Sequence, residues 1–331
     1  SDTAIAAHGG GISSPGDLLE AFFQLLEESS IARAQGNGWT GPDGQALPVH
    51  VTPEGWDLQQ LINKTLIMGI TFSQATDDYL DDDIADKGLN SSLELEEGKS
   101  YTVLEHAWDE AFGYFGAAND YHKYTDEEVA EKGGRPDWQG VHDTDGDGKI
   151  DLTSEAIFGA AGNASKRDLG AIEPTDFSGD VFNAFVAGRK ILADAGGAPS
   201  AEQMSALKVE RDIIVVGWEK AIAATVVHYI NDVLKDMGKF GTDDYEFEHH
   251  AKVFSEMKGF ALGLQYNPRS PMLADFSKLH TLLGDRPTLA TADEAAIGEY
   301  KEDLLAARAL LKSAYGFADA NMGDESGGGG W

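Results

Sequence analysis

The sequence predicts an all-α fold, a large helical bundle interrupted by one acidic loop. Apolar residues recur three and four positions apart along most of the chain, which is the pattern of a helix buried on one face. No stretch of four to eight residues alternates convincingly between apolar and polar side chains, so we expect little β-strand. The chain has 331 residues, 42% of them hydrophobic, and can therefore bury a sizeable core.

The expected helices follow one another along the chain. The first covers residues 15–35, because Ser13 or Ser14 can cap it and Pro15 suits its first position. The other helices are expected at 53–80, 101–117, 152–169, 178–195, 200–237, 244–266, 272–283 and 293–315. The four glycines at 327–330 predict a flexible tail.

The chain is expected to form one all-helical domain over residues 1–331, with a polar insertion at 118–151. The residues at 75–82 faintly resemble those at 224–232, since both segments begin with Ala-Thr and carry a tyrosine before a closing aspartate. Each segment ends a long helix and is followed by another helix rich in His, Glu, Gly and aromatic residues. This similarity suggests two related four-helix bundles, and the alternative is chance likeness between buried helices. The halves would be 15–117 and 178–315.

Composition limits the classes of partner. The formal net charge of −32 repels nucleic acid and attracts cations, so metal ions are expected partners and nucleic acid is not. The chain has no cysteine, which excludes disulfides, thiolate metal sites and a cysteine nucleophile. It starts at Ser1 with neither methionine nor a signal peptide, as a processed or trimmed product would.

No transmembrane segment is expected. The most apolar window, residues 213–234, carries Glu219, Lys220, His228 and Asp232. Four polar or charged residues make this window too polar to lie in lipid.

An acidic segment at residues 143–155 interrupts the helical pattern. Four aspartates occupy the first, third, fifth and ninth places of a calcium loop: Asp143, Asp145, Asp147 and Asp151. Gly148 stands at the sixth place, where the backbone turns sharply, and Lys149 at the seventh would bind through its carbonyl oxygen.

One feature of this segment departs from the calcium-loop pattern. The twelfth place is Ser154, and the carboxylate expected there comes one residue later, at Glu155. The segment still predicts an inserted loop that resembles an EF-hand calcium loop, with Glu155 as a further ligand. The alternative is an acidic turn that binds only water.

The helix expected at 101–117 carries an unusual group of polar residues among Leu104, Trp108 and Phe112. The group is Glu105, His106, Asp109 and Glu110. Acids and histidines from facing helices build iron or manganese sites in helical bundles, so this group, together with His228 from a neighbouring helix, is a candidate transition-metal site. We expect these side chains to point into the bundle. The alternative is ordinary pairing of a histidine with an acid one turn away.

Motifs of hydrolysis and phosphate binding are missing from the sequence. It contains no Gly-x-Ser-x-Gly elbow, no His-Glu-x-x-His helix and no phosphate loop. These absences favour binding without turnover.

Three segments resemble a bacterial helical family of unknown function, DUF4856. They are residues 105–116, 218–231 and 258–271, and the resemblance is expected to run from about residue 50 onward. That family more remotely resembles the imelysin-like proteins, whose marker is Gly-x-His-x-x-Glu on a helix. Here the nearest match is His106 to Asp109, with Leu104 in place of the glycine and Asp109 in place of the glutamate.

The resemblance implies a location and a role. Imelysin-like proteins are helical, iron-regulated and exported to the periplasm or outer membrane, often through a lipid anchor, which here would precede Ser1. We therefore expect an exported, calcium-stabilised protein that binds a metal ion, with iron as its cargo and outer-membrane iron-uptake components as partners. Two alternatives stay open. One is a metallopeptidase in which His106 and Asp109 hold a metal and Glu110 activates water. The other is a structural or surface interaction protein that binds calcium alone.

Overall fold

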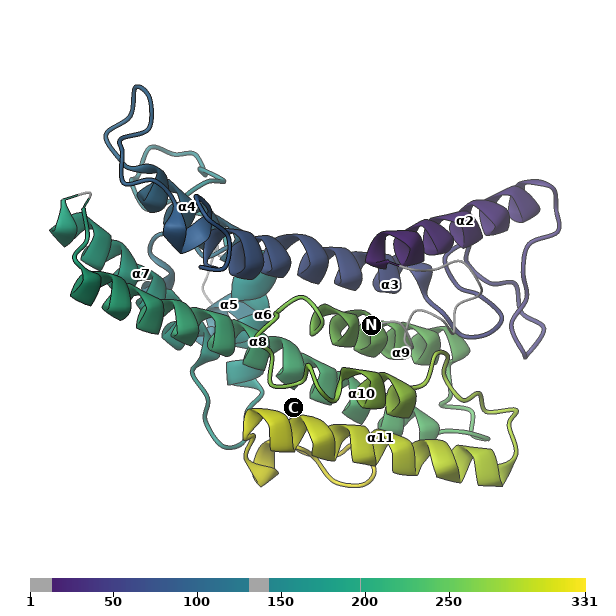
Figure 1. The fold of residues 1–331 in the computed structure, drawn as a ribbon. Coiled ribbons are helices and arrows are strands. Elements are labelled where there is room, and N and C mark those ends of the chain that lie inside the picture. The colour runs from purple at the N-terminus through teal and green to yellow at the C-terminus, as the bar shows by residue number, and fades with distance from the viewer. Residues whose placement is uncertain (1–13, 131–142, 197) are drawn as a thin grey trace. The chain divides into compact units, whose positions relative to one another are not determined.

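The structure, a computed structural model, describes residues 14–130, 143–196 and 198–331. These residues form helices and loops and contain no β-strand, which confirms the predicted all-α helical bundle (Figure 1). The α-helices are α2 (Pro15–Ala34), α3 (Leu58–Leu66), α4 (Val103–Phe115), α5 (Asp126–Ala130), α6 (Gly159–Leu169), α7 (Phe177–Ala195), α8 (Ala201–Met237), α9 (Phe247–Gly263), α10 (Phe276–Leu283) and α11 (Glu294–Tyr315).

Shorter helical segments complete the chain. Two π-helical segments, η1 (Ile67–Phe72) and η2 (Gln74–Tyr79), occupy the second half of the helix predicted at 53–80. Single 3₁₀ turns form η3 (Gly88–Asn90), η4 (Tyr121–Lys123) and η5 (Asp319–Asn321). In the π-helical part, the hydroxyl of Thr76 donates a hydrogen bond to the backbone carbonyl of Phe72 at 2.7 Å. The side chain of Thr76 thus satisfies a backbone acceptor of its own helix.

Two predicted helices begin five or more residues later than expected. Residues 53–57 form a turn, because Gly55 takes a φ of +88° and Thr52 accepts from the amide of Trp56, so α3 starts only at Leu58. The helix predicted at 152–169 starts at Gly159, because the side chain of Asp151 accepts from the amide of Thr153 and holds the residues after it in a turn. Elsewhere the ends are close to the prediction. Asp293 caps α11 through its side chain, and Gly316 ends it with a φ of +68°.

The chain divides into two compact units that are interleaved in sequence. The first comprises Ser1–Leu66, Ala223–Gln265 and Arg269–Trp331, and the second comprises Ile67–Ile222 and Tyr266–Pro268. These boundaries differ from the predicted halves, and they do not test whether those halves are related, so the repeat stays a prediction. The predicted polar insertion contains η4 and α5, and its residues 131–142 lie outside the described part of the chain.

In the first unit, α2 packs on α3, α3 on α9, and α10 on α11. Helix α9 is buried along most of its length, and two of its polar groups are tied to neighbours. The hydroxyl of Ser255 accepts from the amide of Asp57 at 2.8 Å, and Lys258 donates to the carbonyl of Gly284 at 2.8 Å. Because Lys258 is almost completely buried, burial lowers its pKa to about 8, and Asp285 only partly opposes that shift.

The tail of the first unit is ordered, so the prediction of a flexible end is wrong. Trp331 is buried, and its carbonyl accepts from the side-chain amide of Asn231 at 2.8 Å. Arg308 donates to Asn231 at 2.6 Å and to the carbonyl of Asp324 at 2.9 Å. Gly327, with a φ of +83°, leaves no room for a Cβ against the backbone of Asn231. Glycine here permits close packing rather than mobility.

In the second unit, α4 packs against α6 and α7, and α5 packs against α6. Helices α4 and α7 approach closely, because the indole of Trp108 fills the space that a Cβ on Gly188 would need. The same indole donates to the carbonyl of Phe185 at 2.9 Å. Phe115 meets the rings of both Phe185 and Trp218, so an aromatic core fixes α4 relative to its neighbours.

Helix α8 is long and apolar enough to cross a membrane by length and composition alone. In the structure, 72% of its most apolar stretch is buried inside the protein. The core helix of a soluble protein has the same properties, so the prediction of no transmembrane segment stays a prediction.

Candidate metal centre

Three aspartates of the acidic loop lie close together. Ligand oxygens of Asp143, Asp145 and Asp147 all lie within 4.8 Å of one another. Local geometry produces this arrangement: Gly146 and Gly148 take φ values of +74° and +80°, which turn the backbone back on itself between the acids. In the described part of the chain, no lysine or arginine pairs with these three carboxylates.

Backbone amides hold each carboxylate in place. Asp143 accepts from the amides of Gly146 at 2.6 Å and Gly148 at 2.9 Å. Asp145 accepts from the amide of Asp147 at 3.0 Å, and Asp147 accepts from the amide of Lys149 at 2.8 Å. The side chains are therefore preorganised, and three carboxylates that face one another repel until a cation neutralises them.

The carboxylate of Glu155 links the two ends of the acidic loop through hydrogen bonds. One of its oxygens accepts from the amide of Thr144 at 2.7 Å, and the other accepts from the amide of Asp151 at 2.8 Å. The residue is buried, and these hydrogen bonds, with that of Asp151 the largest, hold the pKa of its carboxyl below the usual range. Its position one residue beyond the expected place thus lets it join the two ends of the loop.

Two predicted calcium ligands lie outside the group of three. Asp151 accepts from the amide and hydroxyl of Thr153 and from the hydroxyl of Ser154, and these bonds lower its pKa. The carboxylate of Glu155 is engaged as described above. The structure thus brings together Asp143, Asp145 and Asp147, whereas Asp151 and Glu155 support the turn. Their role as ligands stays a prediction.

The predicted site on α4 contains a cation of the protein itself. Arg189 of α7 donates to Glu105 at 2.7 Å and pairs with Asp109 at 2.9 Å. Glu105 also completes the N-terminal cap of α4 by accepting from the amide of Thr102 at 2.8 Å. Burial would raise the pKa of Glu105, but the bonds from Thr102 and Arg189 outweigh it and lower the pKa. For Asp109 burial prevails over Arg189, and its pKa is raised.

His106 and Glu110 lie on the more exposed side of α4. The Nδ1 atom of His106 lies 2.6 Å from Glu96, and its Nε2 atom lies 3.6 Å from Glu110. The side chains of His106, Asp109 and Glu110 are 39%, 48% and 40% exposed, so the expectation that they point into the bundle is wrong. A helix with this many apolar residues buries them on one face and leaves the acids at its margin.

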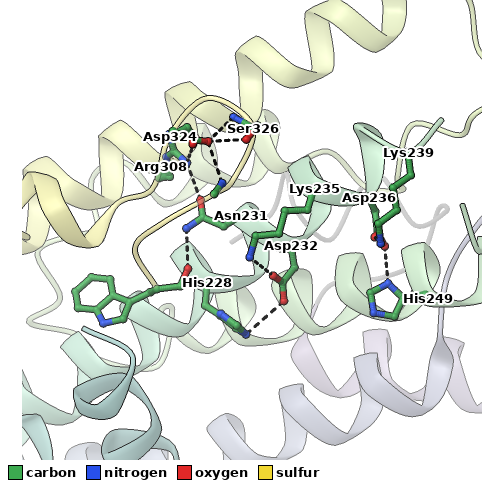
Figure 2. A network of polar contacts seen from close by, with 12 residues as sticks. His228, Asn231, Asp232, Lys235, Asp236, Lys239, His249, Arg308, Asp324 and Ser326 are labelled. Atoms are coloured by element: carbon green, nitrogen blue, oxygen red, sulfur yellow. Dashed lines mark hydrogen bonds and ion pairs between the residues drawn. The ribbon is translucent and has the colours of Figure 1, made fainter. Parts of the chain in front are cut away.

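His228 belongs to the first unit, whereas the α4 group belongs to the second. Its Nε2 atom lies 3.4 Å from Asp232 of the same helix, and Asp232 also pairs with Lys235 at 2.9 Å (Figure 2). His228 is therefore paired within α8. Its role in a site with α4 stays a prediction.

Several residues that pair with the predicted site residues or with other polar groups were not predicted from the sequence. Arg189 is the most important, because it neutralises two predicted ligands, and nothing in the pattern of α7 marks its partner on another helix. Asp236 is a second: it is buried and pairs with His249 at 2.6 Å and Lys239 at 2.7 Å (Figure 2). Asp236 and Lys239 are three positions apart on one helix, so the sequence could have predicted their pairing. No sequence spacing predicts the contact of Asp236 with His249.

The comparison with protein families gives one match. Residues 24–143 match the model of a domain of unknown function, DUF4856. The chain contains a DUF4856 domain. This finding confirms the expected resemblance for the segment 105–116, and the matched region starts before residue 50. The DUF4856 match ends at Asp143, so it contains α4 and only the first residue of the acidic loop, and the segments 218–231 and 258–271 lie outside it.

The other comparisons give no match. No curated protein and no solved structure matches the chain. The remoter resemblance of the DUF4856 domain to imelysin-like proteins is therefore not shown by any of the three comparisons.

Proposed function

We propose that this protein is an exported helical protein that binds Ca²⁺ in the loop 143–155 and is stabilised by it. The observation that carries the proposal is the close approach of the three carboxylates, within 4.8 Å, on a turn preorganised by backbone amides. Calcium is a hard cation that takes roughly six to eight oxygen ligands, and this loop offers only oxygen. The donor set therefore fits calcium.

The expected coordination uses this loop alone. Asp143, Asp145 and Asp147 would bind through their side chains, and Lys149 would bind through its carbonyl oxygen. Asp151 would contribute directly or through water, as the ninth position commonly does. Glu155 would act through the backbone, because its carboxylate ties the amides of Thr144 and Asp151 together.

The exposure of this loop bears on the expected affinity. The side chains of Asp145 and Asp147 are exposed. Extracellular calcium modules bind with dissociation constants of about 10⁻⁴–10⁻³ M, in line with the calcium concentration around them. A weak site of this kind fits a protein that acts outside the cytoplasm.

The iron and peptidase hypotheses concern α4, and both require its acids. A metal ion bound by Glu105 and Asp109 would have to displace the guanidinium of Arg189, which already neutralises them. A peptidase would also need an open coordination position next to a free base, and Glu110 is shared between His106 and the hydroxyl of Tyr79. These hypotheses therefore have less support from the geometry than calcium binding has.

Calorimetric titration of the full chain, freed of metal with a chelator, tests the proposal. We expect one calcium ion per chain, binding lost in Asp145→Asn, and unchanged binding in Asp83→Asn, which removes an exposed acid from a loop of the same unit. Titration with ferrous and ferric iron in the same series separates the hypotheses. Calcium binding that persists in Asp145→Asn would refute the assignment to this loop, and tight iron binding lost in His106→Ala would favour the iron site on α4.

A further inference from the structure

Two hollows lie along one side of α7, both within the second unit. The first, here called the apolar hollow, has a volume of about 750 Å³ and lies between α4 and α7. Its lining includes the rings of Trp108, Phe112, Phe182 and Phe185 and the half-exposed side chain of Val186. This size and this aromatic lining are typical of sites for small organic molecules.

The second, here called the acidic hollow, has a volume of about 370 Å³. Asp126 and Asp176 line it together with the hydroxyl groups of Tyr121, Ser165 and Ser178. Among its lining residues in the described part of the chain there is no lysine or arginine, and there is one histidine, His122. Its walls thus offer hydrogen-bond acceptors and negative charge.

Phe182 lines both hollows, so they adjoin on α7. The acidic hollow lies toward the N-terminal end of the helix, at residues 176–183, and the apolar hollow extends from Phe182 to Asp194. A ligand that fills both must have an apolar body and a polar head, and the head must reach the N-terminal end of α7.

The electrostatics of the acidic hollow favour a positively charged head. Asp168 lies just behind it and accepts from the amides of Phe177 and Ser178, while Asp176 accepts from the amide of Gly179. These bonds occupy the first amides of α7, which would otherwise attract an anion. Asp126 accepts a hydrogen bond from the hydroxyl of Ser178 at 3.2 Å. Burial, and then the negative charge of Asp168, raise the pKa of Asp126, and hydrogen bonds with Ser178 and Ser165 only partly oppose that rise.

The charges around the apolar hollow do not favour an anion either. Arg189 pairs with Glu105 and Asp109, and Lys190 pairs with Asp194 at 2.7 Å. These five groups carry two positive and three negative charges. The field of a chain with a net charge of −32 adds to this preference for cations.

From this charge complementarity we propose that the two hollows form one site for a small amphipathic organic amine, with its apolar body on the aromatic rings and its ammonium group beside Asp126. The site is independent of the calcium loop. The ammonium group would donate to carboxylate and hydroxyl oxygens, and the apolar body would remove the half-exposed side chain of Val186 from water.

Calorimetric titration of the full chain with three molecules that share one apolar body tests the proposal: phenylbutylamine, phenylbutanol and phenylbutyrate. We expect one amine per chain, weaker binding of the alcohol, and the weakest binding of the butyrate. Asp126→Asn should lower the affinity for the amine several-fold and leave that for the alcohol unchanged. Val186→Trp, which fills the apolar hollow from an exposed position, should weaken the binding of both.

Two control variants match these changes. Asp83→Asn removes an exposed acid, and Val209→Trp enlarges an exposed valine on α8; neither residue lines either hollow. Both should bind the amine as the unchanged protein does. The proposal is overturned if the butyrate binds as tightly as the amine, if none of the three binds, or if a control loses binding together with the test variants.

Discussion

Two acidic clusters of the second unit differ in what neutralises them. Asp143, Asp145 and Asp147 lie on a turn with only backbone amides as partners in the described part of the chain. Glu105 and Asp109 of α4 share the guanidinium of Arg189. The first cluster therefore has unbalanced charge that a cation from solution can neutralise, whereas the second has its cation built in. Acidic residues indicate a metal site only where the fold supplies no cation of its own.

Removal of Arg189 should have the largest effect among variants of α4. In Arg189→Met, Glu105 and Asp109 lose their cation while Glu105 stays mostly buried, at 12% side-chain exposure. We expect a loss of about 1–2 kcal/mol in the free energy of unfolding, because a partly buried ion pair costs more to break than an exposed one. Urea unfolding at pH 7 measures it.

The same variant sharpens the comparison between the clusters. Without Arg189, the acids of α4 resemble those of the loop, so Arg189→Met should bind a divalent cation more strongly at α4 than the unchanged protein does. Lys190→Met is the matched control, because Lys190 pairs with exposed Asp194 on the next turn of α7 and with no other acid in the described part of the chain. If the control is destabilised as much as Arg189→Met, the guanidinium does not have the role assigned to it.

The pH dependence of the contributions of Glu155 in the acidic loop and Asp109 on α4 should differ in sign, with a smaller effect than the loss of Arg189 has. The pKa of Glu155 is lowered in the folded state, so its stabilising contribution is present above the ordinary carboxyl range and is lost as the pH falls through the lowered value. The pKa of Asp109 is raised, so its charged form is disfavoured in the folded state and acidification relieves that cost.

Two isosteric variants test this difference in sign. Glu155→Gln replaces an acceptor by an amide donor facing a backbone N–H, so it should destabilise the protein at pH 7 and destabilise it less at pH 3. Asp109→Asn should be neutral or slightly stabilising at pH 7. Urea unfolding at both pH values distinguishes them, and equal destabilisation by the two variants at pH 7 would contradict the account.

The sequence predicted the features that depend on local chemistry. The ends of α11 follow from Asp293 and Gly316, and the turn of the acidic loop follows from its aspartates and glycines, because these residues act on neighbours a few positions away. The periodic apolar pattern likewise placed α7 and α8 to within one residue of their ends.

Features that depend on partners distant in sequence were missed. The pairing of Arg189 with α4 spans 84 positions, and nothing in either helix specifies it. The prediction of a flexible tail was wrong for the same reason. Four glycines in a row indicate flexibility, but Asn231, about a hundred positions earlier, donates to the carbonyl of Trp331 and holds the tail in place. The hollows along α7 are also invisible in sequence, because their aromatic residues fit an ordinary core pattern equally well.

The most direct test of the central claim is thermal unfolding of the full chain with calcium and with chelator. A ligand that binds only the folded state at 100 times its dissociation constant adds about 2.7 kcal/mol to the free energy of unfolding. The account predicts a higher Tm with calcium, a Tm that rises with calcium concentration, and no such response in Asp145→Asn. An unchanged Tm in the original protein, or the same calcium response in Asp145→Asn, would contradict it.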